Sequence, residues 1–172
     1  MPLKATGTAS LDDVYRWDGG TTWIAHPEES MERASHVLNV DGDLWVVDPV
    51  DCEGLDEHFA ELGDVEGVVL LLDRHKRDSA AIARRHDVPV YVHESMDGVA
   101  EELDADIERF GDRLAETGFE VLPVVTSRIW KEVALYDEET GTLVVPESFG
   151  RASYFLAGDE RLGVHPLRRT TP

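Results

Sequence analysis

The residues that could carry chemistry lie in one short segment. The sequence DRHKRDS follows directly on an apolar run, residues 68–72. Carboxylates and imidazoles hold divalent cations in proteins, and histidine is also the commonest general base. Asp73, His75 and Asp78 are therefore candidates for either role. Arg77 cannot be a ligand, because a guanidinium keeps its proton and offers only donors.

The same residue types have ordinary structural roles. Asp78 is placed to cap the helix that follows it. A single histidine such as His75 is more often simply hydrogen-bonded, and Arg77 would then be exposed on the helix. Further along, Arg128 would be a loop arginine and Glu147 a surface acid near a strand end. The local pattern leaves cation binding, general-base catalysis and a structural role open.

The elements that must position these residues begin with two hairpins. The turns DGG (18–20) and DGD (41–43) each separate two short segments rich in β-branched and aromatic residues, which is typical of hairpins. The run 68–72 is continuously apolar, as in a strand buried on both faces. The predicted strands are 14–17, 21–25, 36–40, 44–48, 68–72, 90–92, 119–125, 133–136, 143–145 and 153–156.

Helical spacing of apolar residues predicts three helices. They span 53–62, 79–86 and 97–116, the last from a stripe that includes Val99, Leu103 and Ile107. Hairpins, then β-α-β units, then more strands indicate a mixed α/β fold of two sheets with helices outside. We expect one domain over residues 1–172, with residues 1–10 flexible.

The order of these elements resembles the metallo-β-lactamase fold over roughly residues 34–157. The segment LWVVDP (44–49) resembles the family's strand that ends in Asp-Pro, and VYVH (90–93) resembles the strand after its metal motif. EVALY (132–136) with GTLVV (141–145) resembles a later hairpin of the family. The resemblance implies a four-layer αββα sandwich.

The family's metal motif, T-H-x-H-x-D-H, is altered at this place in the chain. Asp73 stands for its first histidine, and His75 matches the second. Arg77 replaces the aspartate and Asp78 replaces the last histidine. A divalent cation needs several neutral or anionic ligands, so the arginine opposes metal binding.

Two further ligand positions are altered as well. Arg128 replaces the histidine that precedes the EVALY strand, and Glu147 replaces the bridging aspartate. For the last histidine there is no secure match, because His165 follows Glu147 too closely. The resemblance implies that these residues converge at one edge of the sandwich: Asp73, His75, Arg77, Asp78, Arg128 and Glu147.

These substitutions favour a metal-free, non-catalytic relative of the family, a pseudoenzyme with a role in binding, assembly or regulation and no cofactor. One alternative is a metal-dependent hydrolase that uses Asp73, His75, Asp78 and Glu147. Such oxygen-rich ligands suit Mn²⁺ or Mg²⁺ better than zinc. A second alternative is a hydrolase or lyase with His75 as general base. No substrate is indicated.

Composition limits the partners. The chain has 16 Lys+Arg against 36 Asp+Glu, a net charge of −20, which argues against nucleic-acid binding and favours adaptation to high salt. The single cysteine, Cys52, excludes an intramolecular disulfide and a thiolate-rich zinc site. No apolar run spans a bilayer and the first residues show no secretory signal, so we expect a cytoplasmic protein. A homodimer, which would cover surface that so short a domain exposes, stays open.

Overall fold

Two hairpins form one half of the main sheet, and both turn at the glycines that the sequence indicated. Val40 pairs with Asp43 across a two-residue turn in which Asp41 (φ 55°) and Gly42 (φ 100°) both have positive φ. This geometry matches the twist of the flanking strands. The computed structural model describes residues 2–5 and 7–169. The antiparallel strands are β1 (Val14–Trp17), β2 (Gly20–Ile24), β3 (Ala34–Val40) and β4 (Asp43–Val47).

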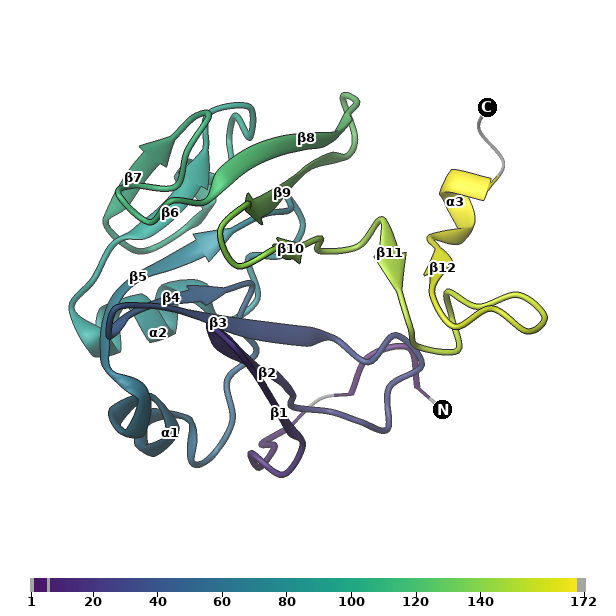
Figure 1. Cartoon of the computed structure of the whole chain (residues 1–172), viewed down its shortest axis with the longest axis horizontal. Coiled ribbons are helices and arrows are strands. Elements are labelled where there is room, and N and C mark those ends of the chain that lie inside the picture. Colours follow the sequence, from purple (N-terminus) through teal and green to yellow (C-terminus); the bar gives the residue numbers. More distant parts are fainter. Residues whose placement is uncertain (1, 6, 170–172) are drawn as a thin grey trace.

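The same sheet continues with parallel strands. From β4 onward these are β5 (Asp64–Leu70), β6 (Val90–His93) and β7 (Ile107–Phe110), which gives the order β1-β2-β3-β4-β5-β6-β7. Helices α1 (Leu55–Leu62) and α2 (Ser79–His86) form the first two crossovers and lie on one side of the sheet (Figure 1). The helices expected at 53–62 and 79–86 are therefore confirmed. No helix within the described residues is long and apolar enough to cross a membrane.

The helix expected over 97–116 is wrong. Only the 3₁₀ turn η1 (Ala100–Glu102) is helical there, and the chain then extends into β7. Phe110, which the helical stripe included, is buried at the end of β7, and His93 of β6 pairs with it. Pairing at the sheet edge thus overrides the local apolar spacing, and Asp104 and Asp106 are weak helix formers.

A second, smaller sheet covers the other face of the first. It consists of β8 (Glu120–Thr126), β9 (Lys131–Asp137) and β10 (Thr142–Val144), all antiparallel, and lies across the large sheet from α1 and α2 (Figure 1). Beyond it come the pair β11 (Phe149–Gly150) and β12 (Gly163–Val164), and the short helix α3 (Pro166–Arg169). The mixed α/β class and the two-sheet sandwich are confirmed.

The strand expected over 153–156 is also wrong. This segment is a turn that places Phe155 in the interior, 6% exposed. Glycines make room for the ring: a Cβ on Gly150 would lie 2.4 Å from it. The chain pairs instead on either side of the turn, where Phe149 lies opposite Val164.

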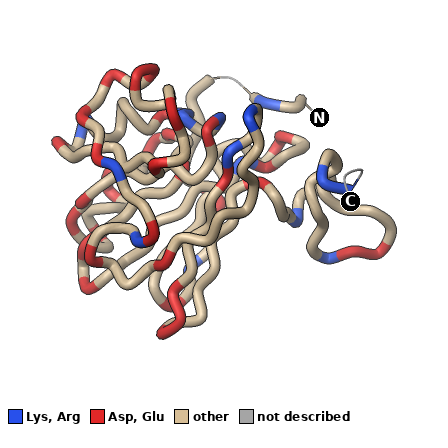
Figure 2. The backbone as a smooth tube through the Cα atoms, turned by 90° about the horizontal axis from the view of Figure 1, so that it is seen from above, with Lys and Arg blue, Asp and Glu red and all other residues tan. Residues whose placement is uncertain are grey.

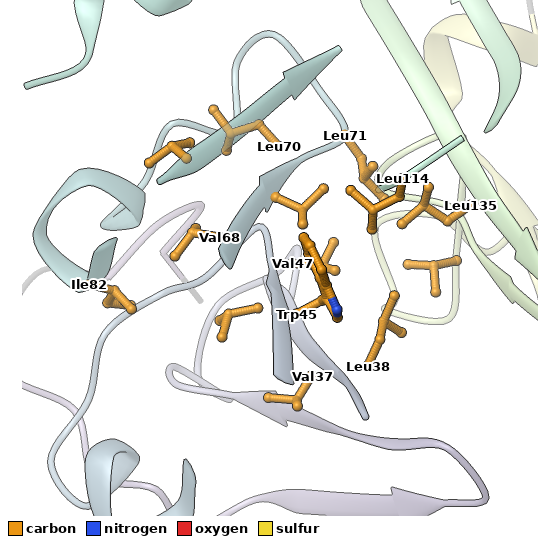
Figure 3. Close-up of a cluster of buried hydrophobic side chains, with 14 of the residues drawn as sticks. Val37, Leu38, Trp45, Val47, Val68, Leu70, Leu71, Ile82, Leu114 and Leu135 are labelled. Carbon is orange, nitrogen blue, oxygen red and sulfur yellow. The ribbon is translucent and has the colours of Figure 1, made fainter. Parts of the chain in front are cut away.

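Packing between the sheets accounts for the core. The run from Val68 to Leu72 is completely buried, as its sequence predicted. Figure 3 shows Leu38 of β3 in the same buried cluster as Leu135 of β9 and Leu114, which precedes β8. Burial of side chains of this size contributes roughly 1.5–3 kcal/mol each.

The two sheets meet at one end of β5. The backbone of the chain after β5 pairs with the start of β9: Val133 N–H donates to Leu71 O (2.9 Å), and Asp73 N–H donates to Lys131 O (3.1 Å). This contact brings the start of β9 beside the DRHKRDS segment.

The first ten residues were expected to be flexible. Met1 and Thr6 lie outside the described residues. Of the others, Ala5 N–H donates to Glu29 Oε1 at 2.7 Å, and Ser10 forms a β-bridge with Glu53.

Candidate functional site

The candidate site lies where the parallel strands of the large sheet end. Asp48 follows β4, and His75 and Arg77 lie in the loop between β5 and α2. The carboxyl ends of neighbouring parallel strands share one edge of a sheet, which brings these side chains together. Asp48 (φ 45°) and Arg77 (φ 38°) both have left-handed backbone, a conformation that persists where surrounding contacts hold it.

Asp48 and His75 form a buried pair. Asp48 Oδ2 lies 3.0 Å from His75 Nδ1, and its Oδ1 accepts the Leu71 N–H at 3.1 Å. Because a carboxylate can only accept, Nδ1 carries the proton and Nε2 carries the lone pair. Burial, together with the charge of Arg77, lowers the pKa of His75, so the imidazole is neutral at pH 7.

The Arg77 guanidinium occupies the other side of the imidazole. Its Nη2 lies 3.3 Å from His75 Nε2 and donates to it, while Nη1 donates to the carbonyl oxygens of Ala34 (2.7 Å) and Asp48. The buried Nε has no partner within the described residues. Arg77 therefore ties the start of β3 to the end of β4 and leaves neither nitrogen of His75 free.

A second cluster surrounds Glu147. Arg74 Nη2 donates to Glu147 Oε2 at 2.6 Å, and the Arg74 guanidinium lies over the Trp130 ring, 4.7 Å from its centroid. His165 Nε2 is 3.6 Å from Glu147 Oε1 and 3.4 Å from the Tyr154 hydroxyl. Burial lowers the pKa of His165. The cation paired with Glu147 is thus Arg74, and not the Arg77 that contacts His75.

Glu132, at the start of β9, is a fully buried carboxylate. Oε1 accepts the backbone N–H groups of Glu147 (3.0 Å) and Ser148 (2.8 Å). Oε2 accepts Trp130 Nε1 (2.8 Å) and the Ser148 hydroxyl (2.9 Å). Four donors compensate for the buried charge, so Glu132 fixes the segment after β10 against β9.

The other candidates from the sequence do not join the cluster. Asp73 Oδ2 accepts the Lys131 N–H at 3.0 Å, and Asp78 Oδ2 accepts the Asp51 N–H at 2.9 Å. Asp78 does occupy the position before α2, but its side chain does not cap the helix, contrary to the expectation. Arg128 is exposed and forms no hydrogen bond or ion pair with the described residues. The structure thus brings His75 and Arg77 together, with Glu147 close enough to act on the pKa of His75.

Sequence reasoning missed Asp48, Arg74 and Glu132 as members of a site, and it set His165 aside because this residue follows Glu147 closely. Asp48 and Glu132 lie in the Asp-Pro and EVALY segments, whose patterns indicate strands and not a site. Arg74 has no motif of its own. Cys52 belongs to neither cluster. Burial, together with the charge of Asp51, raises the pKa of its thiol to about 11.

The residues present do not fit the metal that the resemblance implies. Among the described residues, no group of three or more His, Cys, Asp and Glu side chains is arranged to hold a metal ion. The carboxylates of Asp73 and Asp78 accept backbone N–H groups, and a guanidinium adjoins the His75 ring. Catalytic zinc sites need three protein ligands around an open position.

Comparison with known proteins finds likeness in structure only. No family model matches the sequence, and no curated protein matches it. A crystal structure of DIM-1 metallo-β-lactamase exposed to ceftazidime superposes with a TM-score of 0.63 at 11% identity, covering 90% of this chain and 75% of that one. A second DIM-1 metallo-β-lactamase structure gives 0.60 at 12% identity over 90% and 74%. A structure of TMB-1, described for substrate and inhibitor binding, gives 0.61 at 11% identity over 88% and 73%.

Proposed function

We propose that this chain, which has the metallo-β-lactamase fold, is a metal-free and non-catalytic relative of the hydrolases that share this fold, with a binding role. The observation that carries the proposal is the hydrogen bond from Arg77 to His75 Nε2. It places a permanent cation beside the only histidine that matches the family's metal motif.

The same contact argues against His75 as a general base. A base must offer its lone pair to the proton that it abstracts, within hydrogen-bond reach. Here Nδ1 faces Asp48 and the Nε2 lone pair receives a proton from Arg77. An Asp–His pair of the kind used in hydrolysis is therefore present, but its second nitrogen, His75 Nε2, accepts a hydrogen bond from Arg77.

The balance of charge also supports a site without a cation. The charge of the Asp48 carboxylate acts on the Arg77 guanidinium, which compensates for it, and Glu147 is paired with Arg74. Pairing of carboxylates with guanidinium groups satisfies donors and acceptors together. A divalent ion added here would meet two fixed positive charges.

One observation favours the alternative, a metal-dependent hydrolase that uses Asp73, His75, Asp78 and Glu147. Asp73 Oδ1 is buried and has no partner within the described residues. An unpaired buried oxygen is costly and can mark the place of an ion or water. A site built on it would favour Mn²⁺ or Mg²⁺.

Metal analysis separates the two proposals. The protein is produced in medium supplemented with Zn²⁺ and Mn²⁺, desalted in molar KCl and examined by inductively coupled plasma mass spectrometry. We expect far less than one metal ion per chain, and an unchanged melting temperature after treatment with a chelator. Near-stoichiometric metal, or a melting temperature that a chelator lowers, would establish the metal-dependent alternative instead.

A further inference from the structure

The turn between β8 and β9 presents an apolar side chain and a cation to solvent. The hairpin extends beyond the rest of the small sheet (Figure 1), and the Ser127 N–H closes its turn by donating to Trp130 O at 3.0 Å. Ile129 is 86% exposed. Arg128 is also exposed and forms no hydrogen bond or ion pair with the described residues. We call Arg128 and Ile129 the hairpin tip.

A groove lies where both sheets end, at edge strands β1 and β10. One wall comes from β1–β3 and the other runs from β10 to β11. It consists of two hollows of about 800 Å³ and about 650 Å³. They form one groove, because both are lined by Thr22, His36, Val145, Phe149 and Arg151. We call it the β1–β11 groove.

The lining of the β1–β11 groove combines exposed apolar side chains with unpaired acids. The apolar members with the largest exposure are Leu143, Phe149 and Leu162. Asp18 and Glu32 lie one in each hollow, and neither side chain forms a hydrogen bond or ion pair with the described residues. Arg151 is the one Lys or Arg that lines the groove within the described part of the chain. Exposed apolar surface of this kind marks interaction sites, and here it carries one excess negative charge.

The hairpin tip and the groove lie at the same end of the sandwich. Trp130, at the base of the tip, has the Arg74 guanidinium over its ring at 4.7 Å. The groove borders the Asp48–His75–Arg77 cluster, because Ala34 lines it and Ala34 O accepts a hydrogen bond from Arg77. Neither residue of the tip lines the groove of its own chain. A second copy that faces this end can therefore insert its tip and receive the other, which closes a two-fold dimer.

We propose that the β1–β11 groove receives the hairpin tip of a second copy of the chain in a two-fold dimer. Ile129 packs against the apolar wall beside Leu143, and Arg128 meets the unpaired acids. Charge complementarity selects this occupant, because the tip carries a cation next to an apolar side chain and the groove carries acids next to an apolar wall. The proposal goes beyond the function proposed above: it holds whether or not the chain binds metal, and its test measures mass and not metal content.

Salt sets the conditions for this dimer. Two copies with a charge of −20 each repel one another in dilute buffer, and molar KCl screens that repulsion. The ion pair of Arg128 lies at the surface and contributes little at that salt concentration. The apolar contact of Ile129 therefore supplies most of the affinity, and the test is directed at it.

Sedimentation equilibrium of the full chain in molar KCl tests the proposal. We expect twice the mass of the chain at a concentration of about 0.1 mM. Ile129→Glu and Leu143→Glu should each raise the dissociation constant at least tenfold. Both side chains are largely exposed, so the circular dichroism spectrum of each variant should match that of the original chain. Leu3→Glu is the matched control, because Leu3 is 59% exposed and lies outside the tip and the groove, and it should keep the dimer.

Cross-linking between two variants identifies the contact. In a Cys52→Ser background, one copy carries Ile129→Cys and the other carries Leu143→Cys, and the mixture is oxidised in molar KCl. The mixture should form disulfide-linked dimers at least fivefold faster than either variant alone, because a thiol on the tip then meets a thiol in the groove. The proposal is overturned if the chain is a monomer at about 0.1 mM or if either glutamate variant keeps the affinity of the dimer. It is also overturned if Ile129→Cys alone cross-links as fast as the mixture.

Discussion

The Arg77 side chain joins three parts of the chain. Its Nη1 donates to Ala34 O at the start of β3 and to Asp48 O after β4, and its Nη2 donates to His75. The guanidinium thus connects these three parts of the chain through hydrogen bonds. Removing it would take this donor from Ala34 O and from His75 Nε2, and would leave Asp48 O with the Ser35 hydroxyl as its side-chain donor.

We therefore predict that Arg77→Gln lowers the free energy of unfolding by about 2–5 kcal/mol, because the carbonyl oxygens of Ala34 and Asp48 and the Asp48–His75 pair lose a charged donor. Urea unfolding at fixed molar KCl measures the change. Arg128→Gln is the control: this arginine is exposed and unpaired with the described residues, so its loss should cost less than about 0.5 kcal/mol. Equal effects of the two variants would contradict the structural role of Arg77.

The lowered pKa values of three histidines predict how the stability of the protein depends on pH. Burial lowers the pKa of His36 to about 4, and it also lowers the pKa values of His75 and His165. The unfolded chain then binds more protons between the lowered values and about 6.5, so stability is complete above pH 6.5 and falls as the pH drops toward 4. We expect a loss of up to about 1.4 kcal/mol per pH unit for each histidine in this window. Urea unfolding from pH 7.5 to 4.5 measures it, and a flat profile would be inconsistent with neutral buried imidazoles.

At the scale of elements, the contact between β5 and β9 positions the site. The chain after β5 pairs with the start of β9, and Glu132 on β9 then holds the backbone of Glu147 and Ser148. The Glu147 side chain reaches Arg74 from this fixed segment. The buried carboxylate of Glu132 thus links the small sheet to the segment that carries Glu147.

Glu132→Gln should lower the free energy of unfolding by about 1–3 kcal/mol. The amide NH₂ of glutamine is itself a donor, and it would face groups that donate to the Glu132 carboxylate. Glu139→Gln, on the exposed turn after β9, is the matched control and should be close to neutral. Thermal unfolding at constant KCl compares them. A neutral Glu132→Gln variant would mean that these hydrogen bonds do not anchor the segment.

Local signals predicted the elements that depend on local chemistry. The DGD turn needs two residues with positive φ and specifies its hairpin by itself, and the all-apolar run before Asp73 indicates a buried strand. The helix predicted from the stripe through Val99 and Leu103 does not form, because the same spacing suits a segment in which residues 107–110 pair with β6. Only the sheet edge, built from distant parts of the chain, decides between a helix and β7.

The candidate site could be predicted only in part for a similar reason. His75 and Arg77 lie within one motif-sized segment and were found. Arg128 matched a ligand position by sequence order, but the structure uses Arg74 to pair with Glu147. Arg74 is 73 positions from Glu147 and Arg128 is far nearer in sequence, so only tertiary packing decides which arginine reaches the acid.

At the scale of the whole molecule, the charge distribution is the dominant feature. Acidic residues occur along the entire chain, with fewer basic residues among them (Figure 2). A net charge of −20 on a chain of this size is self-repulsive in dilute buffer. This distribution favours an adaptation to solvent over a dedicated acidic binding face.

The melting temperature should therefore rise steadily with KCl from low to molar concentration. Screening shortens the Debye length from about 30 Å at 0.01 M to about 3 Å at 1 M and relieves the repulsion between acids. Circular dichroism melts in a KCl series measure the effect. A flat or falling trend would remove the high-salt interpretation.

The most direct test of the metal-free site is a crystal structure of the chain grown with Zn²⁺ and Mn²⁺ present, with anomalous data collected at both absorption edges. We predict that Arg77 Nη2 lies within hydrogen-bond distance of His75 Nε2, and that no anomalous peak lies near His75. An anomalous peak surrounded by Asp73, His75, Asp78 and Glu147, with Arg77 turned toward solvent, would contradict the account and establish a metal centre in its place.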